Sequence, residues 1–278
     1  MKKRPIGETP LACQWPRWNS GLMSSHKSHR RRGAAQLNGN PKFWGRHAVL
    51  AAIANPERRV IKIWGTREAL AQMDVPSAMP IQYCDVTDLA RFVPRDAPHQ
   101  GIVAEVAPLE DVWLSDVLEG HEDDDRPLLI LDQVTDPHNV GAIFRSAAAF
   151  DAIAVVTQDR HAPPESGVLA KAASGALETM PWIRVVNLSR ALEEIADHGY
   201  WRIGLTGHAD MTLDQALSPR RNALVLGAEG EGMRHNVAEH CDALAKLPIS
   251  DRMESLNVSN AAAVALYAAA TLRQPKGG

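Results

Sequence analysis

The second half of the chain alternates short apolar runs with helical segments, and this alternation is the feature that most limits its fold. PLLILDQV (127–134) and NALVLGAEG (222–230) are apolar runs, whereas LSRALEEIADHG (188–199) is amphipathic and ends at a glycine. Apolar strands that alternate with helices form a mostly parallel sheet covered on both faces. Residues 127–274 are therefore predicted to be an α/β domain that ends in an alanine-rich helix over about residues 257–273.

A shorter α/β pattern precedes this domain. VIKIWG (60–65), IQYCD (81–85) and HQGIVAEVAP (99–108) are typical of β-strands, with helical segments before and between them. Residues 41–108 are therefore predicted to form a small α/β domain. The acidic segment 109–126, which is followed by Pro127, is expected to be a linker.

The charge of the chain is distributed unevenly. Its 278 residues are 45% hydrophobic and 23% charged, which suits one or two globular domains. Residues 1–40 hold eight basic side chains and one acidic side chain, whereas the rest of the chain holds 22 basic and 32 acidic ones. We expect a basic, disordered arm that contacts a polyanion such as nucleic acid. The alternative is a solvated tail that only aids solubility.

Several function classes are disfavoured by composition. Apolar runs stay far below the roughly 20 residues of a membrane-spanning helix, and the basic start lacks the apolar block of a signal peptide. Cys13, Cys84 and Cys241 are scattered, so neither a disulfide framework nor a cysteine-based zinc site is expected. The eleven histidines include no H-E-x-x-H motif, so we expect no metal. Together these features favour the cytoplasm.

Three segments carry polar residues that a buried core does not require. The first, DPHNVGAIFRSAAAFD (136–151), predicts a helix over Asn139–Phe150 with Arg145 inside its apolar run. The stem of Arg145 can lie on apolar surface while its guanidinium reaches water. Alternatively, the guanidinium presents a fixed fork to a phosphate or carboxylate. The segment alone leaves both interpretations open.

The other two segments lie nearer the C-terminus. LVLGAEGEGMR (224–234) is a glycine-rich turn after a strand, with Glu229 among its glycines. Its G-x-x-G-x-G spacing differs from the dinucleotide-binding fingerprint G-x-G-x-x-G, and a tight strand-to-helix connection would also use it. LPISDRMESLNVSN (247–260) places Ser255 and Asn257 before the alanine-rich helix. Ser and Asn are common N-caps, although several polar residues exceed what capping needs.

Together these segments resemble the motifs of the SpoU/TrmH-type RNA 2′-O-ribose methyltransferases, a branch of the SPOUT superfamily. N-V-G-A-I-F-R-S-A matches the family's first motif, L-V-L-G-A-E-G-E-G-M-R the second and L-P-I-S-D-R-M-E-S-L-N-V-S-N-A the third, in the family's order. The resemblance covers about residues 127–274. Residues 41–108 are similar to the family's ribosomal-protein-like substrate-binding domain. This layout is closest to the bacterial enzymes that methylate a guanosine of 23S rRNA.

The resemblance implies a SPOUT fold, that is, an α/β sheet with a deep C-terminal trefoil knot. It also implies S-adenosylmethionine as the cofactor, an RNA substrate, most simply ribosomal RNA, and a homodimer with its sites at or near the subunit interface. The cofactor would be bound in the knot by loops of the second and third motifs. The residues implied near it are Thr206, Gly207, Gly227, Ala228, Glu229, Leu247, Ile249 and Leu256.

By the same resemblance, Arg145 lies at the reacting ribose hydroxyl. The residues implied to complete the catalytic set are Asn139, Glu229, Ser255 and Asn257. In this family the arginine is proposed to be the base, which is physically awkward because a guanidinium keeps its proton in proteins. We therefore expect Arg145 to position the ribose and an adjacent phosphate, and its role as a base stays open.

Other functions compete with an rRNA methyltransferase. The motifs indicate the reaction rather than the nucleotide, so a tRNA 2′-O-methyltransferase is the first alternative. A non-catalytic RNA-binding relative is the alternative of another class, and the presence of all five implied catalytic residues argues against it. A nucleotide-dependent dehydrogenase is disfavoured by the glycine spacing.

Overall fold

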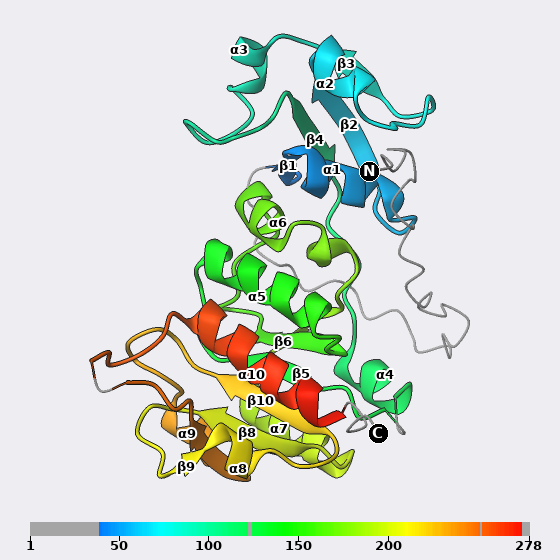
Figure 1. Cartoon of the computed structure of the whole chain (residues 1–278). Coiled ribbons are helices and arrows are strands. Elements are labelled where there is room, and N and C mark those ends of the chain that lie inside the picture. Colours follow the sequence, from blue (N-terminus) through cyan, green and yellow to red (C-terminus); the bar gives the residue numbers. More distant parts are fainter. Residues whose placement is uncertain (1–38, 122–123, 251, 274–278) are drawn as a thin grey trace, which may run out of the picture. The chain divides into compact units, whose positions relative to one another are not determined.

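The computed structural model describes residues 39–121, 124–250 and 252–273, and two β-sheets lie within them (Figure 1). The basic arm predicted over residues 1–40 lies outside the described residues except for its last two positions. The smaller sheet has the strand order β1-β4-β2-β3, in which β4 is antiparallel to both neighbours and β2 is parallel to β3. Its strands are β1 (Lys42–Trp44), β2 (Val60–Gly65), β3 (Ile81–Tyr83) and β4 (Ile102–Val106).

Three helices accompany the smaller sheet. They are α1 (Arg46–Ala54), α2 (Arg67–Ala71) and α3 (Val86–Leu89). Helix α1 ends before Asn55, because Pro56 disfavours a helical conformation of the residue before it. Thr66 caps α2 by accepting a hydrogen bond from the amide of Ala69, and Asp85 caps α3 in the same way through Asp88.

The larger sheet has seven strands in the order β7-β6-β5-β10-β8-β11-β9, and all its paired strands are parallel. The mostly parallel α/β sheet predicted for the second half is therefore confirmed. The strands are β5 (Leu128–Leu131), β6 (Ala154–Gln158), β7 (Trp182–Val185), β8 (Trp201–Leu205), β9 (Met211–Thr212), β10 (Asn222–Leu226) and β11 (Ala243–Lys246).

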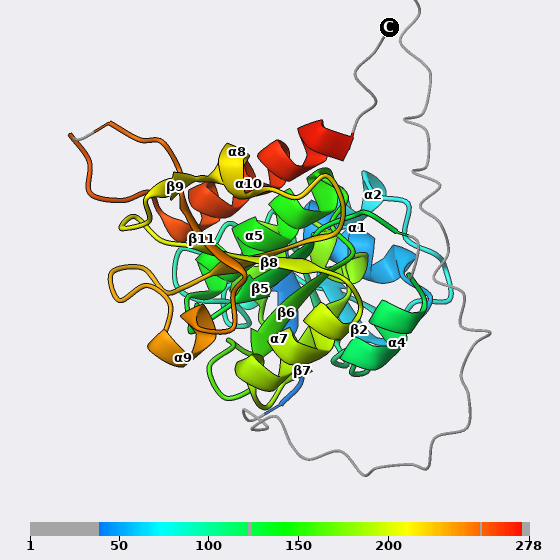
Figure 2. The same ribbon diagram turned by 90° about the horizontal axis from the view of Figure 1, so that it is seen from below.

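Helices cover both faces of this sheet (Figure 2). Side chains alternate along each strand, so Leu129 and Leu131 belong to one buried cluster and Leu128 and Ile130 to another. The first cluster includes buried residues of α5 (Pro137–Ala149), α6 (Gly167–Ala173), the 3-10 helix η2 (Ala176–Glu178), α8 (Leu213–Ala216) and α10 (Val258–Arg273). The second includes α4 (Leu114–Glu119), α7 (Leu188–Asp197) and α9 (His235–Ala238).

Three segments differ from the sequence-based expectations. The segment SGVLAKAASGALE (166–178) has the composition of one helix but is divided into α6 and η2, because Ser174 and Gly175 both have positive φ angles, of 52° and 98°. The segment 109–126, expected to be a linker, contains α4, whose Leu114, Val117 and Leu118 are buried. The segments α9 and β11 were not predicted. In the described part of the chain, we find no helix with the length and apolar character needed to cross a membrane.

Candidate active site

The predicted site segments meet at one edge of the larger sheet. Parallel strands β5, β10 and β8 are neighbours, so their carboxyl ends lie together. Helix α5 follows β5, the glycine-rich loop follows β10, and Thr206 and Gly207 follow β8. The segment before α10 also reaches this edge, because a Cβ added to Gly207 would lie 3.9 Å from the carbonyl oxygen of Glu254. Ligands of open α/β sheets bind at such an edge.

Helix α5 presents two of the predicted polar residues. Its N-cap is Asp136, whose carboxylate accepts hydrogen bonds from the amides of His138 at 3.2 Å and Asn139 at 3.3 Å. Because Pro137 occupies the first turn, the helix begins two residues before the predicted start. Arg145 is exposed and has no hydrogen bond or ion pair with any described residue. Its guanidinium is therefore available to an external group.

Asn139 and Asn257 are brought together directly. The Nδ2 atom of Asn257 donates a hydrogen bond of 3.0 Å to Oδ1 of Asn139. The Oδ1 atom of Asn257 accepts from the amide of Ser259 at 2.9 Å and from its hydroxyl at 2.6 Å. Asn257 thus both caps the start of α10 and connects the third motif to α5, so the two interpretations of its role are compatible.

The glycine-rich loop after β10 folds back on itself. Ala228 and Gly232 exchange two backbone hydrogen bonds, of 3.1 and 2.9 Å. A Cβ at Gly227 would lie 2.1 Å from the carbonyl carbon of Gly232, so only glycine fits there. Glu229 lies exposed in this hairpin and has no hydrogen bond with a described residue. The loop therefore presents backbone groups and one carboxylate at the edge of the sheet.

A buried ion pair that the sequence analysis did not identify anchors this loop. Asp132 directly follows β5 and its side chain is fully buried. Its carboxylate accepts from the amide of Arg234 at 2.9 Å, from Nε at 2.9 Å and from Nη2 at 2.6 Å. The same Nη2 also donates to Gln158 at 2.8 Å. A carboxylate placed directly after a strand buried on both faces is the sequence signal that could have identified it.

The edge of the sheet offers a suitable surface for a nucleoside-containing cofactor. Among the described residues, the backbone amides of Gly207, Ile249 and Leu256 have no hydrogen-bond partner. Ile249 and Met253 are exposed apolar side chains of 38% and 64% relative exposure. Free backbone donors beside apolar side chains can hold a purine ring and its ribose. These residues therefore fit the cofactor that the resemblance implies.

The remaining predicted residues are placed as follows. The amide of Thr206 donates to the carbonyl of Ala245 at 2.9 Å, which ties the end of β8 to β11. Leu247 packs against the main buried cluster. Ser255 is exposed and, within the described residues, has no hydrogen bond. Within the described ranges, no hydrogen bond or ion pair joins Arg145 to the other predicted catalytic residues of the same chain.

Among the described residues, no cluster of three or more His, Cys, Asp and Glu side chains is suited to binding a metal ion.

Comparison with known proteins identifies the family. Residues 126–267 match the SpoU rRNA Methylase family, and residues 43–112 match the family described as RNA 2′-O ribose methyltransferase substrate binding. The chain is 38% identical over 247 residues to the 23S rRNA (guanosine-2′-O-)-methyltransferase RlmB of Pseudomonas putida, an alignment that covers 84% of this chain and 98% of that relative. It is 45% identical over 181 residues to RlmB of Salmonella typhi, covering 64% of this chain and 73% of that relative.

Solved structures share the fold. The AdoMet-bound rRNA methyltransferase of Sinorhizobium meliloti superposes with a TM-score of 0.70 at 20% identity, over 85% of this chain and 88% of that one. The SpoU methyltransferase AviRb of Streptomyces viridochromogenes, in complex with AdoMet, has a TM-score of 0.67 at 20% identity, over 84% and 91% of the two chains. The chain therefore belongs to the SpoU rRNA methylase family of RNA 2′-O-ribose methyltransferases.

Proposed function

We propose that this protein transfers a methyl group from S-adenosylmethionine to the 2′-hydroxyl of a guanosine in 23S rRNA. The observation that carries this proposal is the hydrogen bond between Asn139 and Asn257, which joins the first and third motifs at the edge where the glycine-rich loop also lies. The named relatives support the choice of RNA, because this chain covers almost the whole length of the Pseudomonas putida enzyme.

The cofactor site is assigned to loops at the carboxyl ends of the strands. The residues assigned to hold S-adenosylmethionine are Thr206, Gly207, Gly227, Ala228, Glu229, Leu247, Ile249 and Leu256. When bound, the cofactor supplies an electrophilic methyl group on a sulfonium centre. Backbone amides of this edge would bind its polar groups, and the apolar side chains would contact its purine. The deep trefoil knot implied by the family resemblance is part of this proposal.

Arg145 is assigned to the RNA rather than to the cofactor. A ribose hydroxyl is a poor nucleophile, so its proton must leave as it attacks the methyl carbon. A guanidinium keeps its own proton, but its fork binds phosphate and ribose oxygens in a fixed orientation. The exposed, unpaired state of Arg145 supports this positioning role. Asn139, Asn257, Glu229 and Ser255 are assigned to align Arg145 and the ribose with the methyl group.

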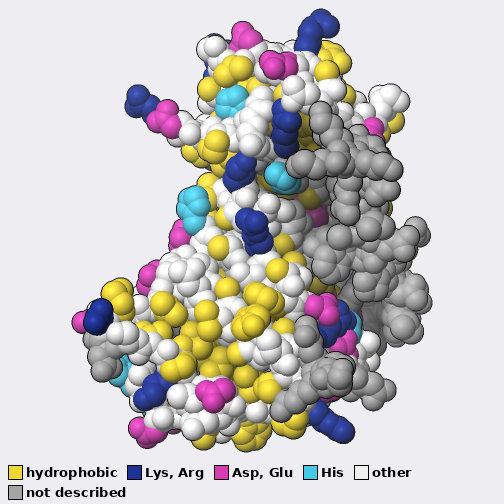
Figure 3. Space-filling model, in the orientation of Figure 1, with side chains coloured by type: hydrophobic (Ala, Val, Ile, Leu, Met, Phe, Trp, Pro, Cys, Tyr) yellow, Lys and Arg dark blue, Asp and Glu magenta, His cyan; other side chains and the backbone are white. Residues whose placement is uncertain are grey.

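A homodimer would complete the site. Within the described ranges, Arg145 has no hydrogen bond or ion pair with the other assigned residues of its own chain, so a second subunit would bring them together. Helix α10 exposes an apolar side formed by Val264, Tyr267 and Leu272, with relative exposures of 46%, 58% and 49%. Hydrophobic side chains gather over this part of the molecule in Figure 3. An exposed apolar helix side next to the site is suited to a subunit interface.

The parts of the chain are assigned complementary tasks. Residues 41–108 would bind a folded RNA surface, residues 127–274 would carry the reaction, and residues 109–126 would connect them. Residues 1–40 would add salt-dependent phosphate contacts. A ribosomal RNA substrate supports the assignment of the protein to the cytoplasm.

The reaction is tested with purified protein, labelled S-adenosylmethionine and separate transcripts of 23S rRNA and tRNA. We expect label in 23S rRNA only, and loss of most transfer in both Arg145→Ala and Arg145→Lys, since lysine keeps the charge but lacks the fork. Cofactor binding measured by calorimetry should persist in both variants. Label in tRNA alone would replace the proposed substrate, and near-normal turnover in Arg145→Lys would remove the positioning role.

A further inference from the structure

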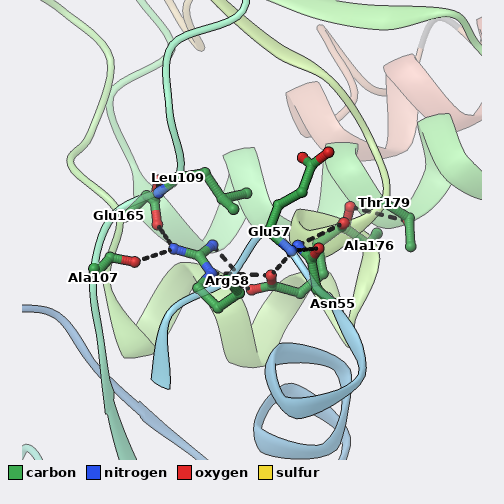
Figure 4. A network of polar contacts seen from close by, with 9 residues as sticks. Asn55, Glu57, Arg58, Ala107, Leu109, Glu165, Ala176 and Thr179 are labelled. Atoms are coloured by element: carbon green, nitrogen blue, oxygen red, sulfur yellow. Dashed lines mark hydrogen bonds and ion pairs between the residues drawn. The ribbon is translucent and has the colours of Figure 1, made fainter. Parts of the chain in front are cut away.

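A buried arginine joins the smaller sheet region to the larger one. Arg58 lies between α1 and β2, and its side chain has 0% exposure. Its Nη1 atom lies 2.7 Å from Oε2 of Glu165, and its Nη2 atom lies 3.0 Å from Oε1 of Glu178. Nε donates to Oε2 of Glu178 at 3.0 Å, and Nη1 donates to the carbonyl of Ala107 at 2.8 Å (Figure 4). The guanidinium therefore binds Glu165, which precedes α6, and Glu178, which follows it. It also binds the carbonyl of Ala107 at the end of the small domain.

The two carboxylates have further partners in this network. Oε1 of Glu165 accepts from the amide of Leu109 at 3.2 Å, at the start of the connecting segment. Oε2 of Glu178 accepts from Nδ2 of Asn55 at 2.9 Å. Glu165 and Glu178 are themselves only 8% and 3% exposed. Each carboxylate thus accepts hydrogen bonds in defined directions, which fix the orientation of the domain contact as well as its separation.

Close packing around this network holds α6 against the small domain. A Cβ added to Gly167 at the start of α6 would lie 1.9 Å from the ring of Trp44 and 2.3 Å from the carbonyl oxygen of Lys42. At the other end of α6, Lys171 donates to Oε1 of Gln100 at 3.2 Å. Helix α6 is therefore held by the small domain along its whole length.

Helix α6 in turn packs closely on the helix that carries Asn139 and Arg145. A Cβ added to Gly141 of α5 would lie 2.5 Å from the carbonyl oxygen of Leu169 and 2.6 Å from the Cβ of Ala172, both on α6. A continuous chain of close contacts therefore runs from Arg58 through α6 to α5.

We propose that Arg58 is a positioning residue for RNA methylation, because its ion pairs with Glu165 and Glu178 hold the RNA-binding domain in one fixed orientation relative to α5. The two domains act as a single rigid unit rather than as modules on a free tether. RNA bound by residues 41–108 is thereby presented to Arg145 in one register. This inference rests on the proposed methylation of RNA.

The test compares a variant that loses only the arginine with a variant in which all three charges are removed. Arg58→Met leaves two buried carboxylates facing each other, which drives the domains apart, whereas the triple variant Arg58→Met, Glu165→Gln, Glu178→Gln removes every charge and keeps the volume. We expect Arg58→Met to raise KM for a 23S rRNA transcript about tenfold or more with a smaller change in kcat. The triple variant should recover most of this loss. S-adenosylmethionine affinity should change less than about twofold in both.

Two additions keep the test decisive. Arg202→Met serves as the matched control, because Arg202 also forms an ion pair, with Asp242, but lies outside the RNA-binding domain and away from the site, at the amino ends of β8 and β11, so its loss should leave KM unchanged. Arg58→Lys replaces Arg58→Met if the latter does not fold, since lysine keeps the charge but cannot bridge both carboxylates in plane, and it should also raise KM.

Amide hydrogen exchange of the free protein separates this inference from the proposed function. Residues 107–112 and α1 should exchange faster in the Arg58 variants than in wild type, whether or not any RNA is methylated. Unchanged exchange, or an unchanged KM in a folded Arg58 variant, would overturn the inference. A wild-type protein that methylates no RNA would instead overturn the proposed function.

Discussion

Replacing Asp132 by Asn tests whether the buried carboxylate after β5 holds the glycine-rich loop. Asp132 is fully buried and accepts three hydrogen bonds from Arg234, two of them from the guanidinium. Asparagine keeps the size of the side chain but removes its charge. Its oxygen can replace one carboxylate oxygen of Asp132, whereas its NH2 group would face a donor of Arg234 at the other position. Hydrogen bonds to a charged group are worth about 1.5–3 kcal/mol each. Loss of two such bonds lowers the free energy of unfolding by about 3 kcal/mol. This is the lower end of the range, because Arg234 is one-third exposed and water can solvate its guanidinium.

This cost can be measured in two ways. For a chain of this size, 3 kcal/mol lowers Tm by roughly 6–12 °C, which circular dichroism detects. If about half of the cost falls on the geometry of the loop, S-adenosylmethionine affinity measured by calorimetry falls about tenfold.

A second ion pair provides a matched control. Asp242 accepts from the amide, Nε and Nη2 of Arg202 at 2.8, 2.9 and 2.7 Å, so the same three donor groups are used as in the Asp132 pair. This pair lies at the amino ends of β8 and β11, away from the site. Asp242→Asn should therefore leave cofactor affinity unchanged. The reasoning is refuted if Asp132→Asn binds the cofactor as wild type does, or if both variants lose affinity equally.

Three further predictions concern association, pH and reactivity. Tyr267→Glu places a charge on the apolar side of α10, so light scattering should report a dimer for wild type and a monomer for the variant; a dimeric variant would remove α10 from the proposed interface. The hydrogen bond with Arg202 lowers the pKa of Asp242, so its contribution to stability is present at neutral pH and is lost as pH falls below about 4. The urea-unfolding difference between wild type and Asp242→Asn should shrink there, and a difference independent of pH contradicts the pairing. Burial raises the pKa of Cys241 to about 12, so at pH 8 its alkylation should be at least about tenfold slower than that of free cysteine. The variant Cys13→Ser, Cys84→Ser isolates it, and alkylation at the free rate contradicts this burial.

Strong local signals made most of the fold predictable. The alternating β-branched run over Val60–Gly65 became a strand with those same bounds, and the apolar run after Pro127 became a strand buried on both faces. Helix α5 was predicted to begin two residues too late, because Asp136 and Pro137 form an N-cap and first turn that the prediction did not use.

Elements that depend on distant partners could not be predicted in this way. β11 has the sequence ALAK, which is equally compatible with a helix, and it is a strand because β8 and β9 offer parallel edges to it. The trefoil knot depends on the order in which distant segments pass one another, which no local pattern encodes. It stays a prediction from the family resemblance.

The functional residues likewise include some that the sequence predicted and some that depend on distant partners. Asn139 and Asn257 were chosen through the motifs, and they form a hydrogen bond although 118 residues separate them. Asp132 and Arg58 were missed, because a single charged residue beside an apolar run resembles a surface residue until its partner is known. Their oppositely charged partners lie 102 residues away for Asp132 and at least 107 residues away for Arg58.

Mapping 2′-O-methyl groups in RNA from a strain that lacks this protein tests the central claim most directly. We predict that one guanosine of 23S rRNA loses its 2′-O-methyl group and that tRNA is unchanged. The wild-type gene should restore the modification, and the Arg145→Ala variant should not. Loss of a tRNA methyl group, with 23S rRNA intact, would contradict the proposed substrate. Full methylation of both RNAs would contradict the proposed activity.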